Sequence, residues 1–185
     1  MNTGLPQRSQ FDTPLSRRTV LHAATVATLT MALPRLSSAT TRTLKNPVQI
    51  GVIADLHHDV MHDGIDRLGA FLKAMEVSKP DAILQLGDFA YPSTENTDII
   101  TLFNQAHTRP LHVIGNHDTD AGFTKDNCID KWGIPGRYYA RDIEGLQLLV
   151  LDGNDAGSPT YKGGYVSYVG KEQVEWLKEQ IAPRI

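Results

Sequence analysis

Cysteine is nearly absent from this sequence. Cys128 is the only one in 185 residues, which excludes an intrachain disulfide and a CxxC zinc site. Any metal site must therefore be built from His, Asp, Glu and Asn side chains. Cys128 lies in KDNCID, a predicted helix with Lys125 and Lys131 as the only basic residues nearby, so it makes a poor nucleophile.

Several motifs and charge patterns are missing as well. No G-x-x-x-x-G-K phosphate loop is present, which argues against a nucleoside triphosphatase, and no G-x-S-x-G motif supports a serine hydrolase. The formal net charge is −3, and no basic stripe with interleaved aromatic residues occurs, so we expect no nucleic-acid partner. The length suits one domain with a core of its own.

The chain also lacks a long hydrophobic run. The most apolar stretch near its start, residues 19–33, is shorter than the roughly 20 residues that cross a bilayer. Arg17 and Arg18 precede it, and Ser37 and Ala39 follow it with the spacing of an A-x-A cleavage site. This layout resembles the twin-arginine signal peptide of exported bacterial proteins.

We therefore predict a twin-arginine-type signal peptide over residues 1–39, a linker over 40–47 and a domain over 48–185. The export machinery of that pathway is then a partner, and the location is periplasmic or secreted, with no stable membrane anchor. An uncleaved N-terminal anchor or a plain tail is the alternative interpretation of the same residues.

The rest of the chain alternates between two kinds of hydrophobic pattern. Buried strands are predicted at 46–55, 80–88 and 110–118, and helices between them at 63–76 and 94–107, the second with Thr94 as its cap. This order favours parallel βαβ units in an α/β fold. Beyond them we expect a hairpin over 137–155 that turns near Glu144–Gly145, a glycine-rich loop or edge strand at 162–170, and a helix at 171–181.

Each of the three predicted parallel strands ends in polar residues. The segments are ADLHHD at 54–59, GDFAY at 87–91 and GNHD at 115–118. The carboxyl ends of parallel strands lie along one edge of the sheet, where ligands bind. We therefore expect the side chains that follow the strands to converge, namely those of Asp55, His57, Asp88, Asn116 and His117.

The chemistry of this set suits two divalent ions. Carboxylate and amide oxygens favour Mn²⁺ or Fe, and imidazole adds Zn²⁺. Asp55 and His57 are two residues apart and can reach one ion, Asp88 can bridge two, and Asn116 offers a neutral oxygen to the second. His117 is suited to stabilising a transition state or to protonating a leaving oxygen. Asp118 is expected to fix the orientation and tautomer of the His117 ring.

These motifs, D-x-H, GD and GNHD about 30 residues apart, resemble those of the calcineurin-like metallophosphoesterases over roughly residues 48–181. The resemblance implies an αββα sandwich with two divalent metal ions (Mn, Fe or Zn) as cofactors. It implies hydrolysis of a small phosphorylated substrate, a phosphomonoester, phosphodiester or pyrophosphate, by a metal-bridging hydroxide. The residue roles it implies are Asp55, His57 and Asp88 at the first ion, Asp88 and Asn116 at the second, and His117 with Asp118 as the catalytic pair.

The sequence departs from that family in its later part. Family members carry further histidines downstream, two of them in a G-H-x-H motif, whereas no histidine follows His117 here. We therefore expect a domain that is incomplete at its C-terminus, and the alternative function is a non-catalytic metal- or phosphate-binding remnant. His58 and His62 are spare candidates for the pocket, while His107 and His112 are expected to be structural.

Other polar residues carry weaker signals. LDGND, residues 151–155, follows a predicted strand, and its Gly, Asn and Asp residues favour a turn over a ligand site. Tyr91, Tyr161 and Tyr165 are candidate substrate contacts, although no spacing selects one of them.

Overall fold

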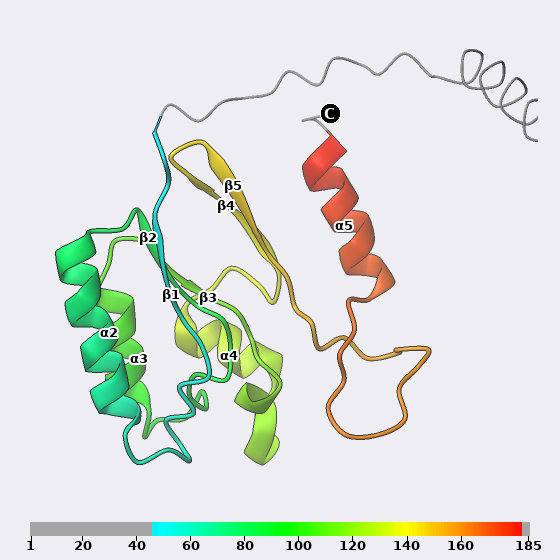
Figure 1. The fold of residues 1–185 in the computed structure, drawn as a ribbon. Coiled ribbons are helices and arrows are strands. Elements are labelled where there is room, and N and C mark those ends of the chain that lie inside the picture. The colour runs from blue at the N-terminus through cyan, green and yellow to red at the C-terminus, as the bar shows by residue number, and fades with distance from the viewer. Residues whose placement is uncertain (1–45, 183–185) are drawn as a thin grey trace, which may run out of the picture. The chain divides into compact units, whose positions relative to one another are not determined.

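The computed structural model describes residues 46–182 (Figure 1). The predicted signal peptide, residues 1–39, and nearly all of the linker lie outside the described residues. The elements, in chain order, are β1 (Ile50–Ile53), α2 (Gly64–Ser78), β2 (Ala82–Gln85), α3 (Thr97–Gln105), β3 (Pro110–His112), the 3-10 segment η1 (His117–Gly122), α4 (Lys125–Trp132), β4 (Tyr139–Ile143), β5 (Leu146–Val150) and α5 (Lys171–Ile181).

Two sheets are formed by these strands. β1, β2 and β3 make a parallel sheet in the order β1-β2-β3, and β4 and β5 make an antiparallel hairpin. Figure 1 shows α2 and α3 on one side of the parallel sheet and the hairpin and α5 on the other. The predicted α/β fold with parallel βαβ units is confirmed, as is the hairpin turn at Glu144–Gly145.

The core lies where the two sheets and the helices meet. All four residues of β2 are buried, as expected for the central strand of a parallel sheet. Phe89 and Phe103 are fully buried with ring centroids 5.3 Å apart, which ties the loop after β2 to α3. The Tyr139 hydroxyl donates to the carbonyl oxygen of His112 and accepts from its N–H, so the hairpin is bonded to β3.

Several predicted boundaries differ from the observed ones. The strand predicted at 46–55 extends only over Ile50–Ile53, and the one predicted at 110–118 stops at His112. Both end before their polar residues, because these leave the ladder to form the site loops described below. Thr94 does not cap α3: the helix begins after Asn96, and the Thr94 carbonyl accepts from Thr97. The segment at 162–170 is a loop with a single bridge, between Asn154 and Tyr168.

His112 and His107 are structural, as predicted. The Nε2 atom of His107 lies 3.0 Å from the carbonyl oxygen of Pro80. His112 is buried, with Nε2 2.7 Å from Asn104 Oδ1 and Nδ1 3.2 Å from Gln85 Nε2. The side-chain oxygen Oε1 of Gln85 accepts from Gly87 N–H, so the side-chain NH₂ group of Gln85 donates to His112 Nδ1. The His112 ring is therefore the neutral Nε2–H tautomer.

The first prediction concerns protonation of His112. Desolvation lowers its pKa from 6.5 to about 3. Between these values the unfolded chain binds the extra proton, so this group makes folding less favourable as pH falls, by up to about 1.4 kcal/mol per pH unit. We expect nitrogen-detected histidine NMR to show a neutral His112 at pH 5. A ring that protonates near pH 6 in the folded protein would contradict the buried hydrogen-bonded arrangement.

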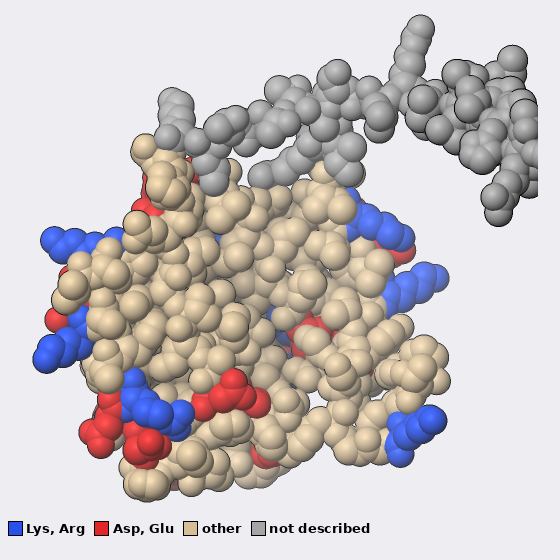
Figure 2. All heavy atoms as spheres, viewed as in Figure 1, with Lys and Arg blue, Asp and Glu red and all other residues tan. Residues whose placement is uncertain are grey.

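No helix in the described part of the chain combines the length and the apolar character that crossing a membrane requires. On the face that Figure 2 shows, the Lys and Arg side chains lie mainly along the margins and do not gather into one broad patch.

Candidate metal centre and catalytic pocket

The loops after β1 and β2 remain bonded to each other beyond the ends of the strands. Asp55 N–H donates to the Gly87 carbonyl oxygen at 3.2 Å, His57 N–H to that of Asp88 at 2.8 Å, and His58 N–H to that of Phe89 at 3.1 Å. Arg67 of α2 donates to the carbonyl oxygens of Asp55 and Leu56 and holds the first loop from the other side. The loops are thus fixed by backbone contacts, which leaves their side chains available to a ligand.

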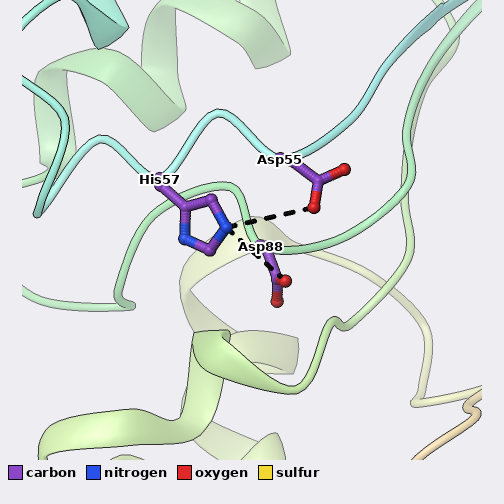
Figure 3. Close-up of side chains that lie close together, drawn as sticks. All are labelled: Asp55, His57 and Asp88. Carbon is purple, nitrogen blue, oxygen red and sulfur yellow. Dashed lines mark ion pairs between the residues drawn. The ribbon is translucent and has the colours of Figure 1, made fainter.

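These hydrogen bonds between the two loops bring three predicted ligands together, as Figure 3 shows. The Nε2 atom of His57 lies 3.9 Å from Asp55 Oδ1 and 3.7 Å from Asp88 Oδ2. One ligand atom from each residue lies within 4.8 Å of the other two. Two carboxylate oxygens and one imidazole nitrogen at this separation suit one divalent cation of the Mn, Fe or Zn type.

All three residues have left-handed backbone conformations. The φ angles are +54° for Asp55, +48° for His57 and +53° for Asp88. Residues other than glycine rarely adopt this region, and such strain persists only where the surrounding structure enforces it. Its concentration in the three residues that share one cluster indicates that the fold holds them in place for a ligand.

Two glycines allow the third strand end to approach the cluster. A Cβ atom on Gly87 would lie 2.6 Å from the Cα of Gly115, and one on Gly115 would collide with the backbone nitrogen and side chain of Asp88. The loops after β2 and β3 therefore touch through bare backbone. As a result His117 N–H reaches Asp88 Oδ1 at 2.8 Å, which leaves Asp88 Oδ2 directed at His57.

The second prediction tests this close approach. Gly115→Ala should displace Asp88 and destabilise the domain by about 2 kcal/mol, or roughly 5 °C in Tm, because the clash is with backbone. It should also weaken binding of Mn²⁺. Gly153→Ala is the matched control, since its Cβ would meet nothing within 4 Å. Equal Tm values for the two variants, measured by thermal unfolding, would show that the loops accommodate a Cβ atom at residue 115 and would contradict the close approach.

Asp118 differs from expectation. Its carboxylate does not hold the His117 ring; it accepts three backbone N–H groups, with Oδ2 2.8 Å from Gly115 N and 2.9 Å from Asp88 N, and Oδ1 2.8 Å from Phe89 N. The side chain is buried, and desolvation raises its pKa to about 6, despite these hydrogen bonds. Asp118 therefore holds the loop after β2 and the loop after β3 together through their backbone N–H groups.

The carboxylate that does contact the His117 ring belongs to Asp120, which sequence reasoning missed. His117 Nδ1 lies 2.8 Å from Asp120 Oδ2, and the Tyr165 hydroxyl donates to the same oxygen at 2.8 Å. The hydrogen bond that His117 Nδ1–H donates to Asp120 raises the pKa of His117, and the same bond lowers the pKa of Asp120. The His117 ring also lies edge-on to His57, with centroids 5.1 Å apart. The His117 ring therefore lies beside the cluster of Asp55, His57 and Asp88.

The other predicted candidates are Asn116, His58 and His62. Asn116 immediately precedes η1 and so adjoins His117, whose backbone is bonded to Asp88. His58 is turned toward α2, where its Nδ1 is buried without a hydrogen-bond partner and a Cβ on Gly64 would contact it. Neither His58 nor His62 lines the pocket described next.

A pocket of about 360 Å³ opens beside the cluster. Its lining consists of His57, Asp59, Val60, Met61, Asp88, Ala90, Tyr91, His117, Asp118 and Asp120. The volume lies in the range of small-molecule sites. Candidate metal ligands, a histidine with a raised pKa and a set of apolar and aromatic side chains are therefore combined in one cavity. Tyr91, one of the three candidate tyrosines, belongs to that set.

The segment after β5 is structural, as its turn-like composition predicted. Asp152 is fully buried and pairs with Lys125 Nζ at 2.6 Å and with Arg137 at 3.2 Å. Arg137 also pairs with Asp155, and Gln173 of α5 donates to that carboxylate. These ion pairs connect α4, the hairpin and α5, and none of the five residues lines the pocket.

Comparison of the chain with known proteins gives one family match. Among solved structures, the chain is similar to a protein of unknown function, AQ665 from Aquifex aeolicus, with 18% identity, 74% of each chain covered and a TM-score of 0.31. None of the curated proteins matches it. The family model for calcineurin-like phosphoesterases matches residues 48–184. The chain therefore belongs to the calcineurin-like phosphoesterase family.

Proposed function

We propose that this protein is a metal-dependent phosphoesterase that hydrolyses a phosphomonoester, a phosphodiester or a pyrophosphate. One observation carries the proposal: Asp55, His57 and Asp88 converge beside His117 at the edge of a pocket in a calcineurin-like domain. A small phosphorylated substrate is the corresponding ligand. A non-catalytic metal- or phosphate-binding domain is the competing function, and the assay below separates the two.

The cluster of Asp55, His57 and Asp88 suits one ion of the two-ion cofactor that the family implies, and Asn116 is proposed for the second. Asp55, His57 and Asp88 would hold the first ion, and Asp88 with Asn116 the second. When bound, Mn, Fe or Zn ions polarise a phosphoryl group and lower the pKa of a coordinated water. Asp88 adjoins the loops that carry both proposed ligand sets, since Oδ1 accepts from His117 N–H while Oδ2 faces His57, and it would be shared between the ions. Asp118 keeps the loops that carry these ligands in register.

His117 is the residue proposed to handle the proton. Asp120 and Tyr165 engage its Nδ1 atom, which leaves Nε2 as the nitrogen available to a substrate oxygen. The hydrogen bond that His117 Nδ1–H donates to Asp120 raises the pKa of His117 and so favours the protonated ring. A protonated Nε2 can donate to the oxygen that leaves phosphorus. Asp118 supports this step by bonding the backbone of Gly115, two residues before His117, and the backbone of the loop that carries Asp88.

The test is hydrolysis by the purified full chain. We expect release of p-nitrophenol from p-nitrophenyl phosphate or bis(p-nitrophenyl) phosphate after loading with Mn²⁺, Zn²⁺ or Fe²⁺. Removal of metal with a chelator should abolish turnover, and readdition should restore it. Binding of metal and inorganic phosphate without turnover of either ester would favour the non-catalytic function.

A third prediction concerns His117→Ala. We expect turnover to fall by about 10²- to 10³-fold, because the proton donor is lost, while metal content stays near that of the wild type. Elemental analysis and steady-state rates on the same samples measure both. His107→Gln is the control, since His107 lies at the opposite end of β3. Loss of metal in His117→Ala would mean that His117 is a ligand.

We also propose export by the twin-arginine pathway. The support is the pair Arg17 and Arg18 ahead of a mildly apolar stretch, in residues that the structure does not describe. Replacing both arginines with lysine should retain the precursor in the cytoplasm of the native host. A processed product in the periplasm or medium despite that change would overturn the proposal.

A further inference from the structure

On the basis of the proposed function, we infer that the substrate carries a single phosphoryl group on an uncharged, apolar ester group. Val60, Met61 and Tyr91 are the residues that select this group. These three residues line the pocket apart from the candidate metal ligands and the His117–Asp120 pair.

Two loops each contribute a pair of apolar or aromatic residues to the pocket lining. Val60 and Met61 are consecutive in the loop after β1, and Ala90 and Tyr91 are consecutive in the loop after β2. Val60 is 68% exposed and Met61 44% exposed, although each lines the cavity. Large apolar side chains that stay in water at the rim of a concave site are typical of ligand contacts. Burial against an apolar ester group would remove this surface from water.

The charges in the lining disfavour a second anionic group on the substrate. Among the described residues no Lys or Arg lines the pocket, whereas Asp59 and Asp120 do. Asp59 cannot swing aside freely, because its carboxylate accepts from Tyr91 N–H at 2.6 Å and from Asn96 Nδ2 at 2.5 Å. A further phosphate, outside the metal-binding groups, would face these carboxylates without a Lys or Arg side chain to pair with. This charge distribution favours simple monoesters over pyrophosphates and nucleoside diphosphates.

The apolar wall is held in shape before a ligand arrives. The N–H groups of Val60 and Met61 both donate to the His57 carbonyl oxygen, at 3.0 and 2.8 Å, so the path of this loop is set by its backbone. The Tyr91 ring packs on Phe123, with centroids 5.8 Å apart. Because these residues are already ordered, binding of a ligand costs little conformational entropy in this part of the pocket.

The hydrolysis step breaks the ester bond between phosphorus and oxygen. Water supplies the new oxygen on phosphorus, and the product alcohol leaves with the proton.

The experiment combines binding and turnover in the Mn²⁺-loaded full chain. Calorimetry compares benzylphosphonate with methylphosphonate, which share one phosphonate group and differ in apolar surface. Turnover compares benzyl phosphate with glycerol 1-phosphate, both esters of primary alcohols. The double variant Val60→Thr with Met61→Gln keeps the size of both side chains and makes them polar. The control is Val77→Thr, a residue of α2 that is 82% exposed and does not line the pocket.

We expect the wild type and Val77→Thr to bind benzylphosphonate about 5- to 10-fold more tightly than methylphosphonate. In the double variant this ratio should fall to about 2 or less, with methylphosphonate binding unchanged. Benzyl phosphate should show the lower KM of the two esters. Equal binding of the two phosphonates by the wild type would overturn the inference and leave the proposed function standing. Failure to hydrolyse any phosphoester would instead refute the proposed function, and the phosphonate ratio would still decide whether the wall selects apolar groups.

Discussion

Asp88→Asn is expected to lower kcat/KM by at least about 10³-fold in a protein that remains folded. Asp88 is the one side chain that faces both halves of the proposed centre. Its Oδ2 atom lies 3.7 Å from His57 Nε2, and its Oδ1 atom accepts from His117 N–H at 2.8 Å. Removing its negative charge would weaken binding of both proposed ions. Asp88→Ala should abolish activity for the same reason.

The asparagine variant separates chemistry from folding better than the alanine variant does. Asn tolerates the left-handed conformation that residue 88 adopts, at φ +53°, and its side-chain oxygen can still accept from His117 N–H. Unfolding in urea should therefore give a midpoint close to that of the wild type. Asp98→Asn, at an exposed position in the first turn of α3, is the matched control. Normal turnover by Asp88→Asn would refute the two-metal site.

The strand ends were the part of the site that sequence could predict. Buried strands in βαβ order place their carboxyl ends on one edge, so polar residues directly after them must gather there. Asp55, His57 and Asp88 lie together in the structure, as this topology predicts. The strand pattern also identifies His112 as a core residue, because a histidine between apolar neighbours in a strand has no route to solvent.

The contacts of His117 could not be predicted in the same way. They depend on how the chain turns after leaving the sheet. The 3-10 segment η1 places Asp120 three residues after His117, on the same side, whereas Asp118 turns inward to the loop backbones. Tyr165 comes from a distant loop, and only tertiary packing puts its hydroxyl next to Asp120. Val60 and Met61 likewise line the pocket because the chain turns after His57. The pattern of apolar residues along the sequence does not predict this turn.

Asp118→Ala is expected to cost about 3–5 kcal/mol of the free energy of unfolding, the largest stability effect of any single change at the site. Its carboxylate, 1% exposed, is the acceptor for three backbone N–H groups, those of Asp88, Phe89 and Gly115. Without it these donors are left unpaired in a region too enclosed for easy hydration. Because a domain of this size has about 5–15 kcal/mol of stability in total, the variant should be close to unfolding.

The comparison with Asp118→Asn makes this prediction specific. Asparagine keeps one acceptor oxygen but turns an NH₂ group toward backbone N–H donors, so we expect most of the loss to remain. Urea unfolding of both variants measures the effect, with Asp126→Ala, an exposed residue in the first turn of α4, as the control. Wild-type stability in Asp118→Ala would mean that the loops hold their register without the clamp. A large loss would show that the residue following His117 sets the metal centre through the backbone, because the same three N–H groups fix where Asp88 and His117 stand.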